Sequence, residues 1–198
     1  LVSKLHKRFP GIRLGVVARG CDERAYIEMA KRNQIDPERL VIIGFACTAE
    51  DAQTCHCLEP YPKRLVVGTP PPPGSVNPLV ARYDAMPIAE RRAFWREQFN
   101  KCIKCYGCRN ICPQCFCNVC ALEDEKWVET GRLPMPNPPM YHLIRAMHMT
   151  AKCVACRECE ETCPAGIPMA VQFRLIAQDV QRMFGYETGA VIDQKPPQ

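Results

Sequence analysis

Two runs of cysteines in this chain share one spacing, Cys-x-x-Cys-x-x-Cys-x-x-x-Cys-Pro. The first run contains Cys102, Cys105, Cys108 and Cys112, and the second contains Cys153, Cys156, Cys159 and Cys163. Three thiolates at three-residue intervals can wrap one corner of an iron-sulfur cubane, while the fourth, just before the proline, turns towards a different cluster. The repeat therefore predicts two [4Fe-4S] clusters and one-electron chemistry.

In this arrangement each run supplies the fourth ligand of the other run's cluster, as in bacterial two-cluster ferredoxins. One predicted ligand set is Cys102, Cys105, Cys108 and Cys163, and the other is Cys153, Cys156, Cys159 and Cys112. A zinc ribbon is the first alternative, but it uses two Cys-x-x-Cys pairs and has no role for a third evenly spaced cysteine. A disulfide framework is the second, and it requires an oxidising compartment.

Composition points to a reduced metalloprotein. The chain has 198 residues, 15 of them cysteine, and a formal net charge of +5. It has no apolar run of the roughly 18 residues that a membrane span needs, and its first residues contain no hydrophobic signal core. We therefore expect a cytoplasmic protein without a membrane span. Each cluster would add four thiolates against a core of roughly +2, so the basic excess does not predict nucleic-acid binding.

The amino-terminal third has the pattern of a small parallel α/β layer. Apolar runs at residues 14–18 and 40–46 predict strands, a third strand is expected at 64–68, and residues 23–34 predict a helix. The proline-rich sequence GTPPPPGSVNP, residues 68–78, cannot continue a helix or a central strand. It predicts a stiff, extended connector.

Helices are predicted around both cysteine runs. Residues 88–100 lead into the first run, residues 141–150 lead into the second, and residues 169–185 follow it. The predicted fold class is α+β, a small α/β segment followed by a mainly helical dicluster ferredoxin domain. The predicted boundaries are 1–68 for the α/β segment, 69–86 for the linker, 87–185 for the ferredoxin domain and 186–198 for a tail.

Four further cysteines lie in the α/β segment, near the ends of its predicted strands. They are Cys21, Cys47, Cys55 and Cys57. Because parallel strands place their carboxyl ends at one edge of a sheet, these thiols could converge there and hold a third [4Fe-4S] cluster. The alternative is that Cys21 and Cys47 are ordinary buried cysteines.

A dense group of three cysteines directly follows the first run, and its function stays open at the level of the sequence. The group is Cys115, Cys117 and Cys120. A fourth cluster completed from elsewhere, or a zinc site that also uses His142 or His148, is one interpretation. The other is a helix that packs three small side chains against a cluster.

Several motifs together resemble a known family. They are GVVARGCDERA, VIIGFAC, the cysteines before EPYP, FWREQFNKCIKCYGCRNICPQCFCNVC and HMTAKCVACRECEETCPAGIPM. This combination is similar to the iron-sulfur family of the beta subunits of deazaflavin-coenzyme (F-420) hydrogenases and dehydrogenases, fused to a dicluster ferredoxin. The resemblance implies an electron-relay subunit of a larger redox complex, with formate dehydrogenase, hydrogenase or heterodisulfide-reductase-like proteins as partners.

A flavin is a further cofactor that the resemblance suggests. The strand-to-helix turn in GCDERA could bind FAD through Gly20, Asp22 and Arg24, because a helix amino terminus favours phosphate. No general acid, base or nucleophile accompanies a recognisable substrate site, so we predict no catalytic residue. The predicted function is electron transfer, the first alternative is a flavin-containing catalytic beta subunit, and the second is a zinc-bound assembly module.

Overall fold

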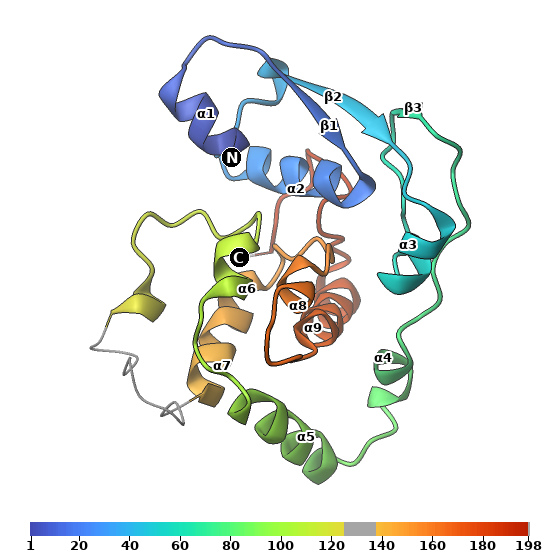
Figure 1. The fold of residues 1–198 in the computed structure, drawn as a ribbon, viewed down its shortest axis with the longest axis vertical. Coiled ribbons are helices and arrows are strands. Elements are labelled where there is room, and N and C mark those ends of the chain that lie inside the picture. The colour runs from blue at the N-terminus through green and yellow to red at the C-terminus, as the bar shows by residue number, and fades with distance from the viewer. Residues whose placement is uncertain (125–137, 198) are drawn as a thin grey trace. The chain divides into compact units, whose positions relative to one another are not determined.

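The computed structural model describes residues 1–124 and 138–197 of this chain, which fall into two compact units (Figure 1). Unit 1 contains residues 1–77, 151–156 and 177–198, and unit 2 contains residues 78–150 and 157–176. Each unit is therefore assembled from segments far apart in the sequence.

Unit 1 is built around three strands and the helix that covers them. Its elements are α1 (Val2–Arg8), β1 (Leu14–Ala18), α2 (Gly20–Lys31), the 3-10 turn η1 (Pro37–Arg39), β2 (Leu40–Phe45), α3 (Ala49–Thr54) and β3 (Leu65–Val67). The three strands form one parallel sheet in the order β1, β2, β3. The predicted parallel layer and all three predicted strands are confirmed.

Side chains alternate across this sheet, as the two-residue period of a strand requires. The register pairs Leu14 with Leu40 and Ala18 with Gly44. One set of side chains along β1 and β2 is covered or half-covered, and α2 packs against both strands. The alternate set, including Val17 and Ile43, is exposed. This part of the structure therefore presents one apolar face of the sheet to solvent.

Helix α2 begins three residues before the predicted start and ends three residues before the predicted end. Arg19 precedes the helix in an extended conformation, and the carboxylate of Asp22 accepts a hydrogen bond of 2.9 Å from the Arg19 backbone N–H. This capping box satisfies groups that a helix start leaves unpaired, so Gly20 and Cys21 join the first turn. The position of Cys21 is thereby set by the cap.

A buried carboxylate ties distant segments of unit 1 together. The Glu28 side chain is fully buried and accepts hydrogen bonds from Tyr186 Oη at 2.7 Å, Gly189 N at 2.7 Å and Lys31 Nζ at 2.9 Å. Arg32 also pairs with Glu28, and its Nη2 donates to the Ala151 carbonyl at 2.8 Å. The network joins α2 to residues near the carboxyl terminus and to the segment that enters the second cysteine run.

The regular structure of unit 2 is helical in the residues that the structure describes. Its elements are α4 (Pro78–Tyr83), α5 (Ile88–Asn100), α6 (Gly107–Ile111), the 3-10 turn η2 (Ala121–Glu123), α7 (Pro138–Met149) and α8 (Glu158–Glu161), with α9 (Met169–Phe184) beginning in unit 2 and ending in unit 1. Helix α5 packs against α7, and the Phe99 ring stacks on the His142 ring with centroids 4.4 Å apart. This pair of helices supports the first cysteine run.

The α+β fold class is confirmed, with a small parallel sheet and many helices. Helix α5 has the bounds that its periodicity predicts, and α9 begins at Met169 and ends beside Gly185 as expected. Helix α4 lies within the range expected to be a linker, 69–86. Among the helices of the described residues, none combines the length and the apolar character that crossing a membrane requires.

Candidate metal centres

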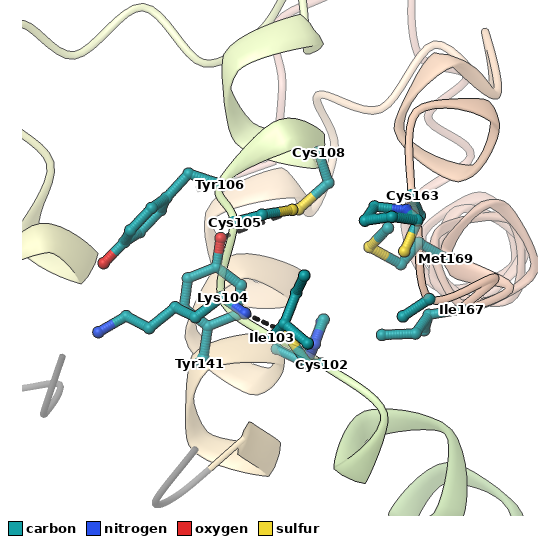
Figure 2. A pocket seen from close by; sticks show the side chains of 13 residues that line it. Cys102, Ile103, Lys104, Cys105, Tyr106, Cys108, Tyr141, Cys163, Ile167 and Met169 are labelled. Atoms are coloured by element: carbon teal, nitrogen blue, oxygen red, sulfur yellow. Dashed lines mark hydrogen bonds between the residues drawn. The ribbon is translucent and has the colours of Figure 1, made fainter. Parts of the chain in front are cut away.

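The first predicted ligand set lines one pocket of unit 2. Figure 2 shows Cys105 and Cys108 across from Cys163, which comes from the second run. The pocket encloses about 330 Å³, part of it open to solvent, and Cys102 completes the set of four thiols on its wall. Its other lining residues include Ile103, Tyr141, Ile167 and Met169. The structure therefore brings together the four cysteines that the crossed pattern assigns to one cluster.

The loop that carries these thiols has an unusual backbone. Lys104 and Tyr106 have φ of 52° and 58°, the left-handed region that bulky residues rarely adopt. The Lys104 backbone N–H donates to the Cys102 Sγ at 3.4 Å. Backbone N–H groups that turn inward in this way form concave nests, which are common at iron-sulfur sites.

The second run repeats this backbone at equivalent positions. Ala155 and Arg157 have φ of 55° and 65°, and they flank Cys156 as Lys104 and Tyr106 flank Cys105. A short helix follows in each run, α6 after Tyr106 and α8 after Arg157, and these two helices pack together. The repeat in the sequence is therefore also a repeat in local conformation.

The second predicted ligand set is divided between the two units. Cys112 and Cys159 belong to unit 2, whereas Cys153 and Cys156 belong to unit 1. In unit 2, the charges of Cys112 and Cys159 both act on the buried side chain of Arg145. The complete second set stays a prediction.

Helix α7 supplies two side chains that contact Cys108 and that the sequence did not single out. The Tyr141 hydroxyl lies 3.8 Å from the Cys108 Sγ, and Arg145 Nη2 donates to the Cys108 carbonyl at 2.7 Å. Tyr141 and Arg145 are four residues apart, so they share one face of the helix. That spacing, in a helix that was predicted, is the signal that could have identified them.

Burial affects the protonation of two thiols of the first pocket, Cys102 and Cys108. It raises the pKa of Cys102 and of Cys108, although the Lys104 N–H opposes the rise at Cys102 and the charge of Arg145 opposes it at Cys108. A thiol in such a setting stays protonated and inert unless a cation replaces its proton. Cys102 and Cys108 are therefore poor nucleophiles as thiols, and they would become metal ligands only by releasing their protons.

The group Cys115, Cys117 and Cys120 has mixed surroundings. Cys115 is hydrogen-bonded to Cys112, an interaction that raises its pKa together with burial, and Cys117 is exposed. Of the two histidines considered as zinc ligands, His142 lines the first pocket and His148 is exposed. Within the described residues, no three side chains of His, Cys, Asp or Glu are arranged to hold a single metal ion. A cubane spreads its thiolates over four irons and needs a wider spacing.

The four amino-terminal cysteines gather at the carboxyl edge of the sheet. Cys21 follows β1 in the first turn of α2, and Cys47 follows β2, where its N–H donates to the Pro60 carbonyl at 2.9 Å. Cys55 caps α3, and Cys57 comes two residues later. The thiol charge of Cys57 acts on both Cys21 and Cys47. The strand ends thus bring the third candidate set into one region.

Electrostatics at this edge combine half-buried thiols with two cations. Burial raises the pKa of Cys21 to about 11, Asp22 adds to the rise, and Arg19 and Arg24 oppose it. The Arg24 Nη2 lies 4.0 Å from the Cys57 Sγ. Cations beside thiols stabilise thiolates and would offset the negative charge of a bound cluster.

The three candidate flavin contacts are all engaged within unit 1. A Cβ at Gly20 would lie 2.6 Å from the carbonyl oxygens of both Glu59 and Tyr61, so the close packing of this backbone requires glycine. Asp22 accepts from the Arg19 Nε at 3.1 Å, and Arg24 Nη1 donates to the Glu59 carboxylate at 3.0 Å. These contacts position Cys21 beside the loop that carries Cys55 and Cys57.

Two formate dehydrogenase beta subunits resemble this chain. The "F420-dependent formate dehydrogenase subunit beta" of Methanocaldococcus jannaschii is 42% identical over 103 residues, which are 52% of this chain and 27% of that protein. The "F420-dependent formate dehydrogenase 1 subunit beta" of Methanococcus maripaludis is 48% identical over 103 residues, 52% of this chain and 26% of that protein. The chain therefore spans about a quarter of the length of these relatives. No family model matches the chain.

The cysteine content and these relatives fit an iron-sulfur protein of electron transfer. They agree with the part of the sequence resemblance that concerns formate dehydrogenase beta subunits. The fusion to a dicluster ferredoxin, which the resemblance also implied, stays a prediction.

Proposed function

We propose that this chain is an iron-sulfur electron-transfer segment of a formate dehydrogenase complex. The observation that supports it most is the pocket lined by Cys102, Cys105, Cys108 and Cys163, three thiols from one run and one from the other. The names of the two relatives supply the identity of the complex. An iron-sulfur cluster bound by such ligands accepts and releases single electrons.

The residues around the first pocket suit that role. The Lys104 N–H and the Tyr141 hydroxyl lie at hydrogen-bonding distance from ligand sulfurs, where they would stabilise added negative charge. Ile167 and Met169 are almost fully buried and keep water from one wall of the pocket. Burial and hydrogen bonds to sulfur are the protein's main means of setting a cluster's reduction potential.

The full proposal includes the second set and a third cluster. In it, Cys112, Cys153, Cys156 and Cys159 hold the second cluster of a dicluster segment at residues 87–185. The amino-terminal set of Cys21, Cys47, Cys55 and Cys57 holds the third. For Cys115, Cys117 and Cys120 we propose a supporting role beside the clusters.

We propose that electrons pass between a formate dehydrogenase or hydrogenase partner and a heterodisulfide-reductase-like or other acceptor in the cytoplasm. The formate dehydrogenase partner follows the names of the relatives, and the hydrogenase partner and the acceptor follow the family resemblance of the cysteine motifs. A cytoplasmic location suits a chain with 15 cysteines, since thiols stay reduced there.

The proposal is tested by the metal and flavin content of anaerobically purified protein, with electron paramagnetic resonance after reduction. About twelve irons per chain without flavin would support three clusters, and about eight would restrict the proposal to the ferredoxin sets. About sixteen would add a cluster at Cys115, Cys117 and Cys120. Zinc without iron would overturn the proposal, and stoichiometric FAD with formate turnover would favour a catalytic flavoprotein.

The proposed donor requires a separate experiment. The purified chain is mixed with a formate dehydrogenase catalytic subunit and formate, and the visible absorbance of the clusters is followed. Bleaching that depends on both additions would support the donor. Clusters that bleach with dithionite but not with formate and the catalytic subunit would contradict it.

A further inference from the structure

Arg145 is a buried cation beside the first pocket. Its side chain lies in α7, is 2% exposed as a residue, and has its guanidinium carbon 5.3 Å from the centre of the Phe173 ring. Nη2 donates to the Cys108 carbonyl at 2.7 Å, and Nη1 lies 3.8 Å from the Met169 sulfur. Within the described part of the chain the buried Nε–H meets no acceptor. Such a buried charge needs a counter-charge.

The counter-charges near Arg145 are four thiols of unit 2, three of which belong to the two ferredoxin ligand sets. Burial alone would lower the pKa of Arg145, but the charges of Cys108, Cys112, Cys115 and Cys159 raise it above its usual value. Cys115 lies outside both sets and is hydrogen-bonded to Arg145 and to Cys112. Cys108 belongs to the first set, whereas Cys112 and Cys159 belong to the second. All three lie in unit 2 with Arg145. The guanidinium therefore stays charged and faces sulfur ligands from two clusters.

The two arginines within the cysteine runs, Arg109 and Arg157, are paired with carboxylates. Arg109 pairs with Glu123 at 2.8 Å, and Arg157 pairs with Glu160 at 3.0 Å. Among the residues that the structure describes, no carboxylate pairs with Arg145. Its charge is thus left to act on the thiolates, and burial protects that interaction from solvent screening.

We propose that the Arg145 guanidinium is a positive charge shared by the two ferredoxin ligand sets, and that it raises the reduction potential of both clusters. The inference rests on the proposed function, because it requires the two clusters to be present. Reduction adds one negative charge to a cluster, and a buried cation stabilises the reduced form more than the oxidised form. Removing the charge should therefore shift both potentials to more negative values.

The test is a redox titration of the 198-residue chain, followed by electron paramagnetic resonance, with iron content measured on each sample. Arg145→Gln should keep the wild-type iron content and shift both cluster signals to more negative potentials. Arg145→Lys keeps the charge and should keep both potentials near the wild-type values. Arg109→Gln is the matched control, since it removes the same charge from an ion-paired position, and its shifts should be several-fold smaller.

The outcomes distinguish failure of the proposed function from failure of the inference about Arg145. Wild-type protein without iron would overturn the proposed function and this inference with it. Iron-loaded Arg145→Gln protein with unchanged potentials, or with one shifted signal only, would overturn the inference and leave the proposed function standing. If Arg145→Gln loses iron, Arg145→Lys decides. Its full iron content and unshifted potentials would support the charge, whereas loss of iron there as well would assign Arg145 to holding the Cys108 carbonyl.

Discussion

The two cysteine runs have the same backbone but different side chains and supports. Tyr106 in the first run and Arg157 in the second both begin a short helix from the left-handed region. The Tyr106 hydroxyl donates to the Leu122 carbonyl at 2.9 Å, whereas Arg157 pairs with Glu160. Neither residue type favours this conformation. Local side-chain preference therefore does not explain the backbone that the two runs share.

The supports differ more than the loops do. In unit 2, the first run is held by α7 through Tyr141 and Arg145. In unit 1, the segment that enters the second run is held at Ala151 by Arg32, whose guanidinium is paired with Glu28. Loops of equal local structure can thus be disturbed separately, because their supports lie in different units.

The largest effect is expected when the cysteine that each run contributes to the other run's predicted cluster is replaced. Cys163→Ala should abolish the cluster of the first run, and Cys112→Ala should abolish that of the second, because each cluster would lose one of four ligands. Each variant should lose about four irons per chain. Iron analysis and the paramagnetic signals of the reduced protein measure the loss.

A cysteine variant outside the two predicted ligand sets is the control for this experiment. Cys117→Ala should keep both ferredoxin clusters, since Cys117 is exposed and lies outside both predicted sets. If Cys163→Ala removes the signal of the second run instead, the crossed arrangement is wrong. If Cys117→Ala removes either signal, the residues from 115 to 120 are part of the scaffold.

The next largest effect is expected at the support of the second run. Burial would raise the pKa of Glu28, but hydrogen bonds from Tyr186, Lys31, Arg32 and Gly189 together hold it below its usual value. Glu28→Gln leaves buried cations without their partner, which costs about 3–5 kcal/mol. The apparent melting temperature, measured anaerobically at one heating rate, should fall by roughly 10 °C.

The direction of the Glu28 pKa shift also predicts how the destabilisation in Glu28→Gln depends on pH. A carboxylate with a lowered pKa stabilises the fold fully above its unfolded value, and the stabilisation is lost only as pH falls through the lower folded value. The deficit of Glu28→Gln should thus be equal at about pH 7.5 and about pH 6. Asp179→Asn, in an exposed ion pair with Arg182, should change the melting temperature by less than about 2 °C. An equal drop in both variants would contradict the role of burial.

Much of the fold could be predicted because its signals are local. The strand at 14–18 and helix α5 have the predicted bounds, since apolar runs and helical periodicity lie within one segment. The cysteine spacing likewise predicted the four thiols that line the first pocket. Helix α2 was displaced by three residues because its cap depends on the pair Arg19 and Asp22.

The side chains that hold the two runs in place could not be predicted, because their partners are distant in the sequence. Glu28 and Tyr186 are 158 residues apart, and neither lies in a motif. Arg145 and Tyr141 lie in a predicted helix, but only the packing of α7 against the first run gives them a function. Sequence patterns predict which thiols could bind metal, whereas the groups around those thiols depend on tertiary contacts.

A smaller and more selective effect is expected at Tyr141. Tyr141→Phe removes the hydroxyl that lies 3.8 Å from the Cys108 Sγ and should leave the ring packing intact. Loss of one such hydrogen bond should disfavour the reduced first cluster by about 1 kcal/mol, or roughly 40 mV for a one-electron couple. The second cluster should keep its potential. Redox titration of both signals measures this, and an equal shift of the two would contradict a contact with one ligand set.

The smallest effect concerns the shared backbone itself. Ala155 has φ of 55°, which costs an alanine about 1–2 kcal/mol, whereas glycine adopts it freely. Glycine also gains about 0.4–1 kcal/mol of entropy in the unfolded chain, so Ala155→Gly should stabilise by only about 0.5 kcal/mol. Ala177→Gly, inside helix α9, should instead destabilise by about 1 kcal/mol. The anaerobic melting temperature should therefore rise in Ala155→Gly and fall in Ala177→Gly. Changes of opposite sign would assign the strain to the loop conformation that both runs adopt.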